Sequence, residues 1–492
     1  MSAANAVPRK AANSARNVAI VGAGVAGLAA AEALTRDGAN VILLERRAHV
    51  GGRAYSYLHP ALDEVVDSQH VLVGCCSNLI DLTDRAGLAD RIRWYDRQTW
   101  LEPANTARGP QATIIQIGSL PAPLHYAASF LRAPMLSLAD KLAIARGLME
   151  FRCGAQGHDG AAALDQESVG QWYARTGQTG RAIHHLWEPL VLATLNDSSD
   201  NCSMKYAGKV FYELFLSNRS GGRLGIPTVP LSDFYSAVAA RIAAQGGRIE
   251  MRAGVDSLAQ QADGRWMLRS ADRDFLADDV ILALPFEQTQ RLLSSMSLAG
   301  SAGEEPRSEL LATMTRFAHS PYISVLLWFD REITDLDHAW LLDSPLHWFF
   351  HKSRIRGYPA GSGSYVEVVI SGSRADLPKS REELLATALS ELARFFPEAA
   401  RARVVKSGVL KEARATFTLP PGEDAARLAQ TTAIPGLYLA GDWTATGWPS
   451  TMEGACRSGR LAAGAVTGNP ARFLSPDRPP TGLSRWLAKS AG

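Results

Sequence analysis

The feature that most constrains this chain is a short apolar strand that runs into a glycine-rich turn near the amino terminus. Residues 18–21 predict a buried strand, and the turn after them opens a helix in the G-x-G-x-x-G pattern of Gly22, Gly24 and Gly27. Gly22 permits the tight turn, Gly24 lets backbone N–H groups approach a pyrophosphate, and Gly27 lets the helix pack closely on the strand. With Ala23 between them, these glycines predict a phosphate site at the positive end of the helix dipole.

A second predicted strand, residues 41–44, ends at Glu45. This acid lies close to the offset of about 20 residues at which a carboxylate accepts hydrogen bonds from a ribose and repels a 2′-phosphate. The segment therefore suits the adenosine part of FAD or NAD and not that of NADP. Arg46 follows at once, and Gly52 and Arg53 then offer a further close backbone approach and a cation near the pyrophosphate.

A second glycine-rich segment, LYLAGDWTATGWPSTMEGACRSG, lies near the other end of the chain, at residues 437–459. In it, Gly441 and Asp442 follow a predicted strand, and residues 449–454 supply backbone donors at a helix start. A single fold that uses both glycine segments must be assembled from pieces about four hundred residues apart. An ordinary strand-ending turn is the alternative interpretation of Gly441 and Asp442.

Together these residues resemble the superfamily of FAD-dependent amine oxidases and phytoene desaturases. The resemblance implies FAD as the cofactor, with Asp442 at the ribityl chain or the phosphates. It also implies that a helix start with Thr451 and Met452 faces the flavin ring, and that backbone near Val255 touches the adenine. An empty Rossmann-like scaffold without a nucleotide is the alternative.

We therefore expect an α/β fold in which a Rossmann-like FAD-binding domain, assembled from discontinuous segments, carries an α+β substrate-binding domain. The expected FAD-binding domain comprises residues 1–78, 224–287 and 432–470, the substrate-binding domain residues 79–223 and 288–431, and a carboxy-terminal extension residues 471–492. Between the glycine segments, strands are expected within residues 247–255, 266–269, 279–285, 322–329 and 365–370, and a helix over residues 137–151.

Composition excludes several classes of function. The 492 residues include 51 basic and 49 acidic side chains, so the net charge of +2 gives no electrostatic case for nucleic acid. The five cysteines have no zinc-like spacing, which indicates reduced thiols in a cytosolic protein and no metal site. Cys75 and Cys76 are expected to be buried thiols, with a redox pair as the alternative. The first 16 residues do not resemble a signal peptide, and no apolar run approaches the ~20 residues of a spanning helix.

Four internal segments make the resemblance more specific: DSQHVLVG (67–74), WEPLVLATLN (187–196), SPYISVLLWFD (320–330) and HWFFHK (347–352). With the late glycine segment, they are similar to bacterial hydroxysqualene dehydroxylases, the squalene-associated FAD-dependent desaturases of hopanoid synthesis. This resemblance implies an enzyme in which hydroxysqualene loses its allylic hydroxyl group and reduced flavin delivers hydride to give squalene. An allylic C–O bond that ionises needs an acid at the oxygen and a hydride donor.

The expected proton donor is His70, because DSQH follows the early flavin motif and family members carry a similar Gln-His there. Lining the ring or positioning the loop is the alternative role, and Ser68 stands where a glycine is expected. Glu188 is the second candidate acid. Trp187 and Trp448 are expected to line the substrate and shelter a cation with their ring faces, with ordinary core packing as the alternative.

The expected partner is an isoprenoid lipid, which requires an apolar site near a membrane surface. Residues 124–138 and 483–489 combine apolar and basic side chains, so we expect a cytoplasmic protein with peripheral contact at the inner face of the cell membrane. No second nucleotide motif appears, so an external electron donor is expected to reduce the flavin. Three other functions stay open: a carotenoid or phytoene-type desaturase, a flavin amine oxidase, and a prenyl-binding protein without redox chemistry.

Overall fold

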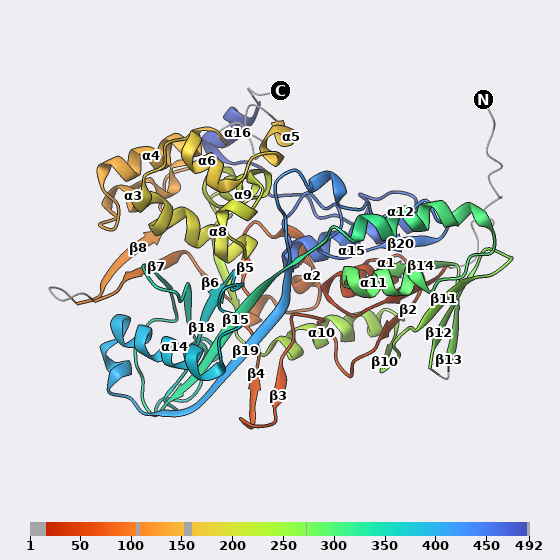
Figure 1. The fold of residues 1–492 in the computed structure, drawn as a ribbon, viewed down its shortest axis with the longest axis horizontal. Helices are drawn as coiled ribbons and strands as arrows, with labels where there is room; N and C mark the ends of the chain where they lie inside the picture. The colour runs from red at the N-terminus through yellow and green to blue at the C-terminus, as the bar shows by residue number, and fades with distance from the viewer. Residues whose placement is uncertain (1–15, 105–108, 152–159, 272, 490–492) are drawn as a thin grey trace.

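A five-stranded parallel sheet forms the core of one half of the molecule (Figure 1). The computed structural model describes residues 16–104, 109–151, 160–271 and 273–489, so Cys153 and the predictions for residues 1–15 and 490–492 lie outside the described residues. The strand order is β10 (Arg248–Met251), β2 (Asn40–Glu45), β1 (Asn17–Val21), β14 (Asp279–Leu282) and β20 (Leu437–Leu439). The expected α/β fold with a sheet built from separated segments is confirmed.

Both faces of this sheet are covered, which is why its strands are runs of apolar residues. Val18 and Ile20 pack in the cluster that contains α1 (Val25–Arg36), α10 (Leu231–Ala244) and α15 (Met452–Val466). Ala19 and Val21 face the other way, into the cluster that contains a small sheet and α11 (Phe286–Ser294). The strands of that small sheet are β11 (Ser257–Gln260), β12 (Trp266–Ser270) and β13 (Arg273–Ala277).

A seven-stranded sheet forms the core of the other half (Figure 1). Its strands, in order, are β19 (Val404–Phe417), β15 (His319–Phe329), β18 (Ser364–Ser371), β17 (Trp348–His351), β16 (His338–Leu341), β7 (Arg97–Glu102) and β8 (Gln111–Gln116). Helix α14 (Arg381–Phe395) covers one face, where Leu384 and Leu392 pack on Val325 and Val368. Residues 79–223 supply β7 and β8 as well as a helical region, and β7 pairs in parallel with the distant β16.

A helical region begins after β8 and lies above the seven-stranded sheet in the view of Figure 1. Its elements are η2 (Leu124–Tyr126), α3 (Ala127–Arg132), α4 (Leu138–Met149), α5 (Gly160–Asp165), α6 (Val169–Arg175), α7 (Gly180–Ala182), the π-helix η3 (Ile183–Trp187), α8 (Glu188–Leu195), α9 (Met204–Phe211) and the π-helix η5 (Tyr212–Ser217). Helix α4 starts at a capping box made by Ser137 and Asp140. Leu138 and Leu142 of this helix are 71% and 62% exposed, so they do not face the core.

The carboxy-terminal residues 471–489 form a strap that joins the two halves. After α15 the strap passes Gly74, whose carbonyl oxygen accepts a hydrogen bond from Arg478 Nε. The N–H of Thr481 then donates to Ser217 O at 3.0 Å. The strap ends in α16 (Gly482–Lys489), where the N–H of Leu483 donates to Ala122 O at 2.9 Å. The extension therefore packs along the protein from the half that contains the five-stranded sheet, which we call the flavin half after the expected cofactor, to the helical region.

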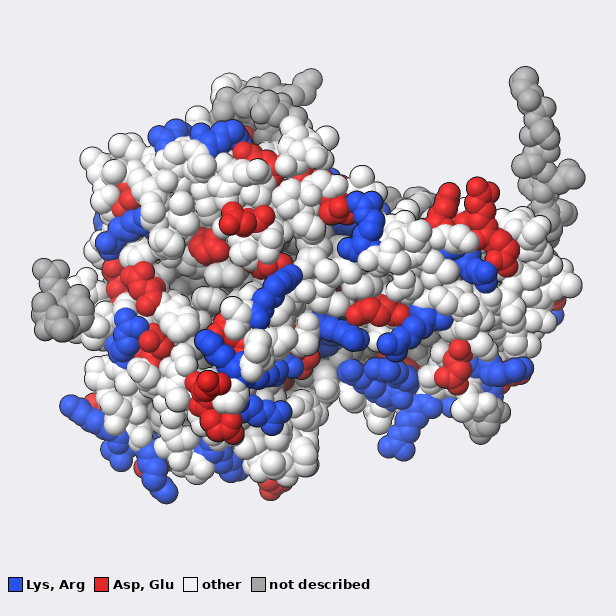
Figure 2. Space-filling view, in the orientation of Figure 1, with Lys and Arg blue, Asp and Glu red and all other residues white. Residues whose placement is uncertain are grey.

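Charged side chains of both signs are interspersed over the face shown in Figure 2. This pattern agrees with the nearly equal numbers of basic and acidic residues. Among the described residues, no helix combines the length and the apolar character that crossing a bilayer requires.

Candidate cofactor and substrate site

The glycine turn after β1 has the close packing that its sequence predicts. Gly22 has a φ of +103°, and a Cβ atom on it would lie 2.5 Å from Ala283 O in the segment after β14. A Cβ on Gly27 would lie 1.9 Å from Gly22 O, so α1 packs directly on the turn. A larger side chain at Gly27 would therefore move α1 away from the strand end, and one at Gly22 would collide with the backbone after β14.

Glu45 fixes the turn from the end of β2. Its buried carboxylate accepts hydrogen bonds from the N–H of Ala23 and the N–H of Arg47, both at 2.8 Å. The segment that follows β10 is a third backbone segment at the end of β2. The N–H of Ala253 donates to Glu45 O at 2.8 Å, and Gly254 packs against Arg46. Val255 follows directly and is half-buried. The residues expected at the adenosine therefore lie around one strand end.

The second glycine pair lies against the first. The N–H of Gly51 donates to Ala23 O at 2.8 Å, and a Cβ on Gly52 would lie 2.9 Å from Gly24 Cα. Helix α1 starts at Gly24 with no side-chain cap and with no acidic residue in its first turn. The first N–H groups of α1 thus have no side-chain carboxylate or hydroxyl group as a hydrogen-bond acceptor. A bound anion can be that acceptor. This cradle fits the pyrophosphate of a dinucleotide.

The two ends of the chain meet at Asp442. Arg53 Nη2 lies 2.5 Å from Asp442 Oδ1, and Ser450 Oγ donates to Asp442 Oδ2 at 2.5 Å. Burial alone would raise the pKa of Asp442, but the Arg53 charge and these hydrogen bonds outweigh it and hold the pKa below its usual value. The early and late glycine segments therefore form one site, as the sequence predicts.

Helix α15 begins at this site and crosses α1. Thr451 caps it by accepting a hydrogen bond from the N–H of Gly454 at 3.2 Å, and Met452 Sδ accepts one from Tyr235 Oη at 3.1 Å. Gly441 precedes Asp442 with its N–H bonded to Ser458 Oγ at 2.8 Å. The start of α15 is thus held next to the carboxylate that Arg53 contacts.

His70 lies on the loop between β4 (Glu64–Val66) and β5 (Leu72–Val73). Its Nδ1 lies 2.8 Å from Ser68 O. A carbonyl oxygen only accepts, so Nδ1 carries the proton and Nε2 carries the lone pair. Burial lowers the pKa of His70, and the hydrogen bond to Ser68 O and the charges of Asp67 and Glu367 offset that effect only in part. A neutral ring with this tautomer is a proton acceptor at Nε2, and the proton-donor role expected of His70 stays a prediction.

Glu188, the second candidate acid, starts α8 in the helical region. Tyr173 Oη lies 3.4 Å from one carboxylate oxygen and the N–H of Ser199 lies 3.4 Å from the other. Burial raises the pKa of Glu188 more than these weak hydrogen bonds lower it. A carboxyl group in this environment holds a proton to higher pH than an exposed glutamate does.

The two candidate aromatic residues have different surroundings. Trp187 is fully buried, donates from Nε1 to Gln178 Oε1 at 2.7 Å, and packs edge-on against Trp172. This is the environment of a core side chain, which differs from the substrate-lining role expected of it. Trp448 lies two residues before Ser450, and its buried Nε1 has no hydrogen-bond partner. Lys209 Nζ lies 4.9 Å from its ring centroid.

Sequence reasoning missed a cluster of buried charges beside His70. Lys352 is fully buried and lies 2.6 Å from Glu367 Oε2, and it also pairs with the carboxylate of Asp67. The one signal for it was the single glutamate within the apolar strand SYVEVVIS. A buried acid in such a strand requires a partner, but the sequence does not say which.

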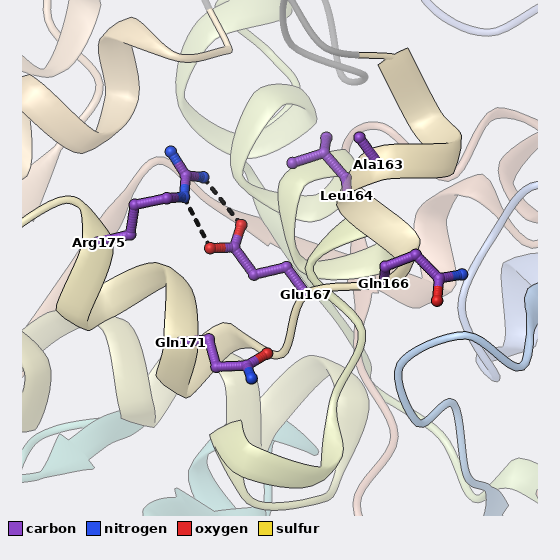
Figure 3. A pocket seen from close by; sticks show the side chains of 6 residues that line it. All are labelled: Ala163, Leu164, Gln166, Glu167, Gln171 and Arg175. Carbon is purple, nitrogen blue, oxygen red and sulfur yellow. Dashed lines mark hydrogen bonds and ion pairs between the residues drawn. The ribbon is translucent and has the colours of Figure 1, made fainter.

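Two surface hollows are lined mostly by other residues, although the second reaches Arg356, which pairs with Asp67. One is lined by Ala163, Leu164, Gln166, Glu167, Gln171 and Arg175, and its Arg175 guanidinium pairs with the Glu167 carboxylate (Figure 3). The other lies between the segments that contain Arg91 and Arg356. Neither hollow contains a predicted site residue. Among the described residues, no group of three His, Cys, Asp or Glu side chains could hold a metal ion.

Comparison with known proteins places this geometry in context. The profile of the family described as "Flavin containing amine oxidoreductase" matches residues 25–467. The chain is 26% identical over 471 residues to a 15-cis-phytoene desaturase of an Oncidium hybrid cultivar, covering 93% of this chain and 79% of that one. It is 26% identical over 497 residues to a zeta-carotene desaturase of Zea mays, covering 93% and 84%.

A solved structure, the cyclohexylamine oxidase from Brevibacterium oxydans IH-35A, superposes with a TM-score of 0.63. The match covers 92% of this chain and 99% of that one at 19% sequence identity. At this identity the likeness shows the fold alone, which is the two-part fold described above.

Proposed function

The chain belongs to the flavin containing amine oxidoreductase family and is an FAD-dependent oxidoreductase, and from this premise we propose that it acts on a long acyclic isoprenoid. The leading reaction of this proposal is desaturation of a carotenoid-type hydrocarbon. Reductive dehydroxylation of hydroxysqualene to squalene is the second candidate. The names of the relatives support the first reaction better than the second.

The residues described above would hold FAD along its length. The start of α1 with Gly24 and Gly52 would take the pyrophosphate, and Glu45 would accept ribose hydroxyl groups. Asp442 and the start of α15 would hold the remainder. When bound, FAD accepts a hydride from a substrate or, once reduced, gives one up.

The observation that carries the desaturase reaction is the 2.8 Å contact between His70 Nδ1 and Ser68 O, from which the tautomer is inferred. Desaturation takes a hydride from one carbon and a proton from the next, and the electrons of the second C–H bond become the new double bond. The proton needs a base, and a neutral imidazole with its lone pair on Nε2 is a suitable one. The lowered pKa of His70 keeps the ring in this form at neutral pH.

Dehydroxylation of hydroxysqualene is favoured by other observations. The four internal segments quoted from the sequence resemble the dehydroxylases, and Glu188 lies in one of them. That reaction needs an acid at the departing oxygen, which then leaves as water. The raised pKa of Glu188 suits the role of an acid.

One experiment separates the two reactions. Oxidised enzyme is incubated with phytoene and a quinone as electron acceptor, and chemically reduced enzyme is incubated anaerobically with hydroxysqualene. We expect a desaturated product in the first arm and no squalene in the second. Squalene in the second arm alone would establish the dehydroxylase instead. Turnover of a primary amine with release of peroxide would indicate an amine oxidase, and a colourless protein would indicate a prenyl-binding protein.

The proposal includes peripheral contact with a lipid surface, through which an isoprenoid enters and leaves. Seven large apolar side chains of residues 120–142 and 483–486 are each at least 45% exposed, and we group them as the apolar patch: Leu120, Leu124, Leu131, Leu138, Leu142, Leu483 and Trp486. The strap joins the two parts of the patch, since Leu483 bonds to Ala122 O. Exposed Arg132 and Arg485 flank it and would attract anionic headgroups. The side chain of Lys489, expected here too, lies outside the described residues.

Co-sedimentation with anionic liposomes tests this contact. We expect wild-type protein in the pellet and the double variant Leu131→Ser/Trp486→Ser in the supernatant. The control is Leu276→Ser, which removes a 40% exposed leucine from β13 on the other half and leaves binding unchanged. Equal binding by all three proteins would contradict the role of the patch. Cytoplasmic localisation and an external redox partner for the flavin are further parts of the proposal.

A further inference from the structure

The segment that carries His70 is held by charged side chains. Residues 67–70 are neither helix nor strand, although they connect β4 to β5. Lys352 Nζ donates to Asp67 O at 2.6 Å, and both oxygens of Glu367 accept from the N–H of Gln69, at 2.9 and 3.1 Å. The position of this segment therefore depends on two buried ions, Glu367 from β18 and Lys352 from the short helix α13 (Lys352–Ile355) after β17.

These ions belong to a balanced cluster of two bases and two acids. Lys352 pairs with Asp67 and Glu367, and Arg356 Nη2 lies 2.8 Å from each carboxylate oxygen of Asp67. Ser324 Oγ donates to Glu367 Oε1 at 2.6 Å. Burial alone would lower the pKa of Lys352, but the two carboxylates outweigh it and raise the pKa, so the ammonium stays charged.

A buried cluster of this kind is weak evidence for stability, because apolar side chains of similar volume would stabilise the fold about as well. What the cluster supplies is a defined position for the groups it contacts, since each charge is paired with specific partners. Three of its hydrogen bonds end on the backbone of residues 67–70, and a further one inside the segment joins His70 Nδ1 to Ser68 O. The cluster and the tautomer of His70 are thus one connected arrangement.

We propose that Glu367 and Lys352 are positioning residues that, with Asp67, fix the ring of His70 for proton transfer. The inference rests on the proposed function, which puts His70 in the active site. Neither residue touches the substrate in this proposal. They act by holding the backbone of residues 67–70, so that the ring keeps its hydrogen bond to Ser68 O and presents Nε2.

The proposal predicts opposite pH effects from two variants. The charged groups that act on His70 are Asp67, Glu367 and Lys352, of which the acids raise its pKa and the lysine lowers it. Glu367→Gln removes a negative charge and should move the acid limb of the kcat/KM profile to lower pH. Lys352→Met removes a positive charge and should move it to higher pH. Misplacement of the ring should also lower kcat by about 10- to 100-fold while KM changes less.

Two further variants keep the test decisive. Lys352→Arg retains the charge and should leave the acid limb in place, so it is the charge-retaining control for Lys352→Met. Asp279→Asn weakens the ion pair of a buried acid with Arg16 at the amino end of β14, and it should leave the pH profile unchanged. Limbs that stay in place, or that move the same way in both charge-removing variants, would overturn the proposal.

A crystal structure of Glu367→Gln gives a readout that needs no turnover. We expect residues 67–70 to be displaced and the contact between His70 Nδ1 and Ser68 O to be broken. An unchanged segment would refute the positioning role even if activity were lost. If the wild-type enzyme converts neither isoprenoid, the proposed function fails, and this structural comparison still decides whether the cluster holds the segment.

Discussion

The role of His70 depends on a single hydrogen bond. From the sequence it was an acid candidate, because a histidine next to a flavin motif can donate or accept a proton. The contact of Nδ1 with Ser68 O fixes the proton on that nitrogen, and burial keeps the ring neutral. The ring therefore suits the role of a base, and desaturation requires a base.

The kcat/KM for desaturation should therefore decrease at acidic pH and not at mildly basic pH. The ordinary pKa of histidine is 6.5, and that of His70 is lowered, so kcat/KM for desaturation should be constant at pH 7 and decrease only below pH 6.5. His70→Gln should lower kcat by about 10²- to 10⁴-fold and leave the FAD content unchanged. A rate that rises as the pH falls through this range would mean that His70 donates a proton, as dehydroxylation requires.

At the scale of elements, the crossing of α1 and α15 determines whether the two chain ends can meet. A Cβ on Gly459 would lie 2.0 Å from Ala26 O and 3.0 Å from Ala30 N. Gly459→Val should push α15 off α1, destabilise the protein by about 1–3 kcal/mol and weaken FAD binding. Thermal unfolding and FAD titration measure both effects. Gly180→Ala is the control, because a Cβ there meets nothing within 4 Å, and equal behaviour of the two variants would contradict the close crossing.

The elements that the sequence predicts are the ones whose signals are local. The turn at Gly22 and the strand that ends at Glu45 are read from neighbouring residues, and both are confirmed. Strand pairing over long distances is not local. The pattern of residues 247–255 predicts a strand. It does not show that β10 pairs with β2 in the five-stranded sheet and not with the strands of the three-stranded sheet. For the same reason, β7 and β8 were not foreseen at the edge of the second sheet.

The candidate site shows the same limit. Asp442 and Arg53 could be predicted to meet because each belongs to a glycine segment with a known role in the resembled superfamily. Glu367 and Lys352 could not be paired, since Glu367 is a lone charge in an apolar strand and Lys352 starts a short basic helix that also contains Arg354. Trp187 could not be assigned either, because a tryptophan in the core and a tryptophan that lines a cavity look alike in the sequence.

At the scale of the whole molecule, the strap couples the flavin half to the apolar patch. Asp477 of the strap pairs with Arg457 of α15 at 2.7 Å and with Lys209 of α9 at 3.1 Å. A protein that ends at Pro479 keeps these pairs but loses Leu483 and Trp486. We expect it to retain FAD, because the glycine segments are intact, and to bind anionic liposomes several-fold less well. Loss of FAD from this protein would show instead that the strap supports the flavin site.

The central claim is that one FAD is held by both ends of the chain. The most direct test is the FAD content per chain of purified protein, measured from the absorbance of flavin released on denaturation. Wild-type protein and Gly180→Ala should each contain one FAD. Gly52→Val fills the cradle at the amino end, and Asp442→Ala removes the contact at the carboxyl end. Each variant should contain less than a tenth as much FAD, since a loss of about 1.4 kcal/mol in binding free energy lowers the affinity tenfold. Full FAD content in either variant would contradict the account.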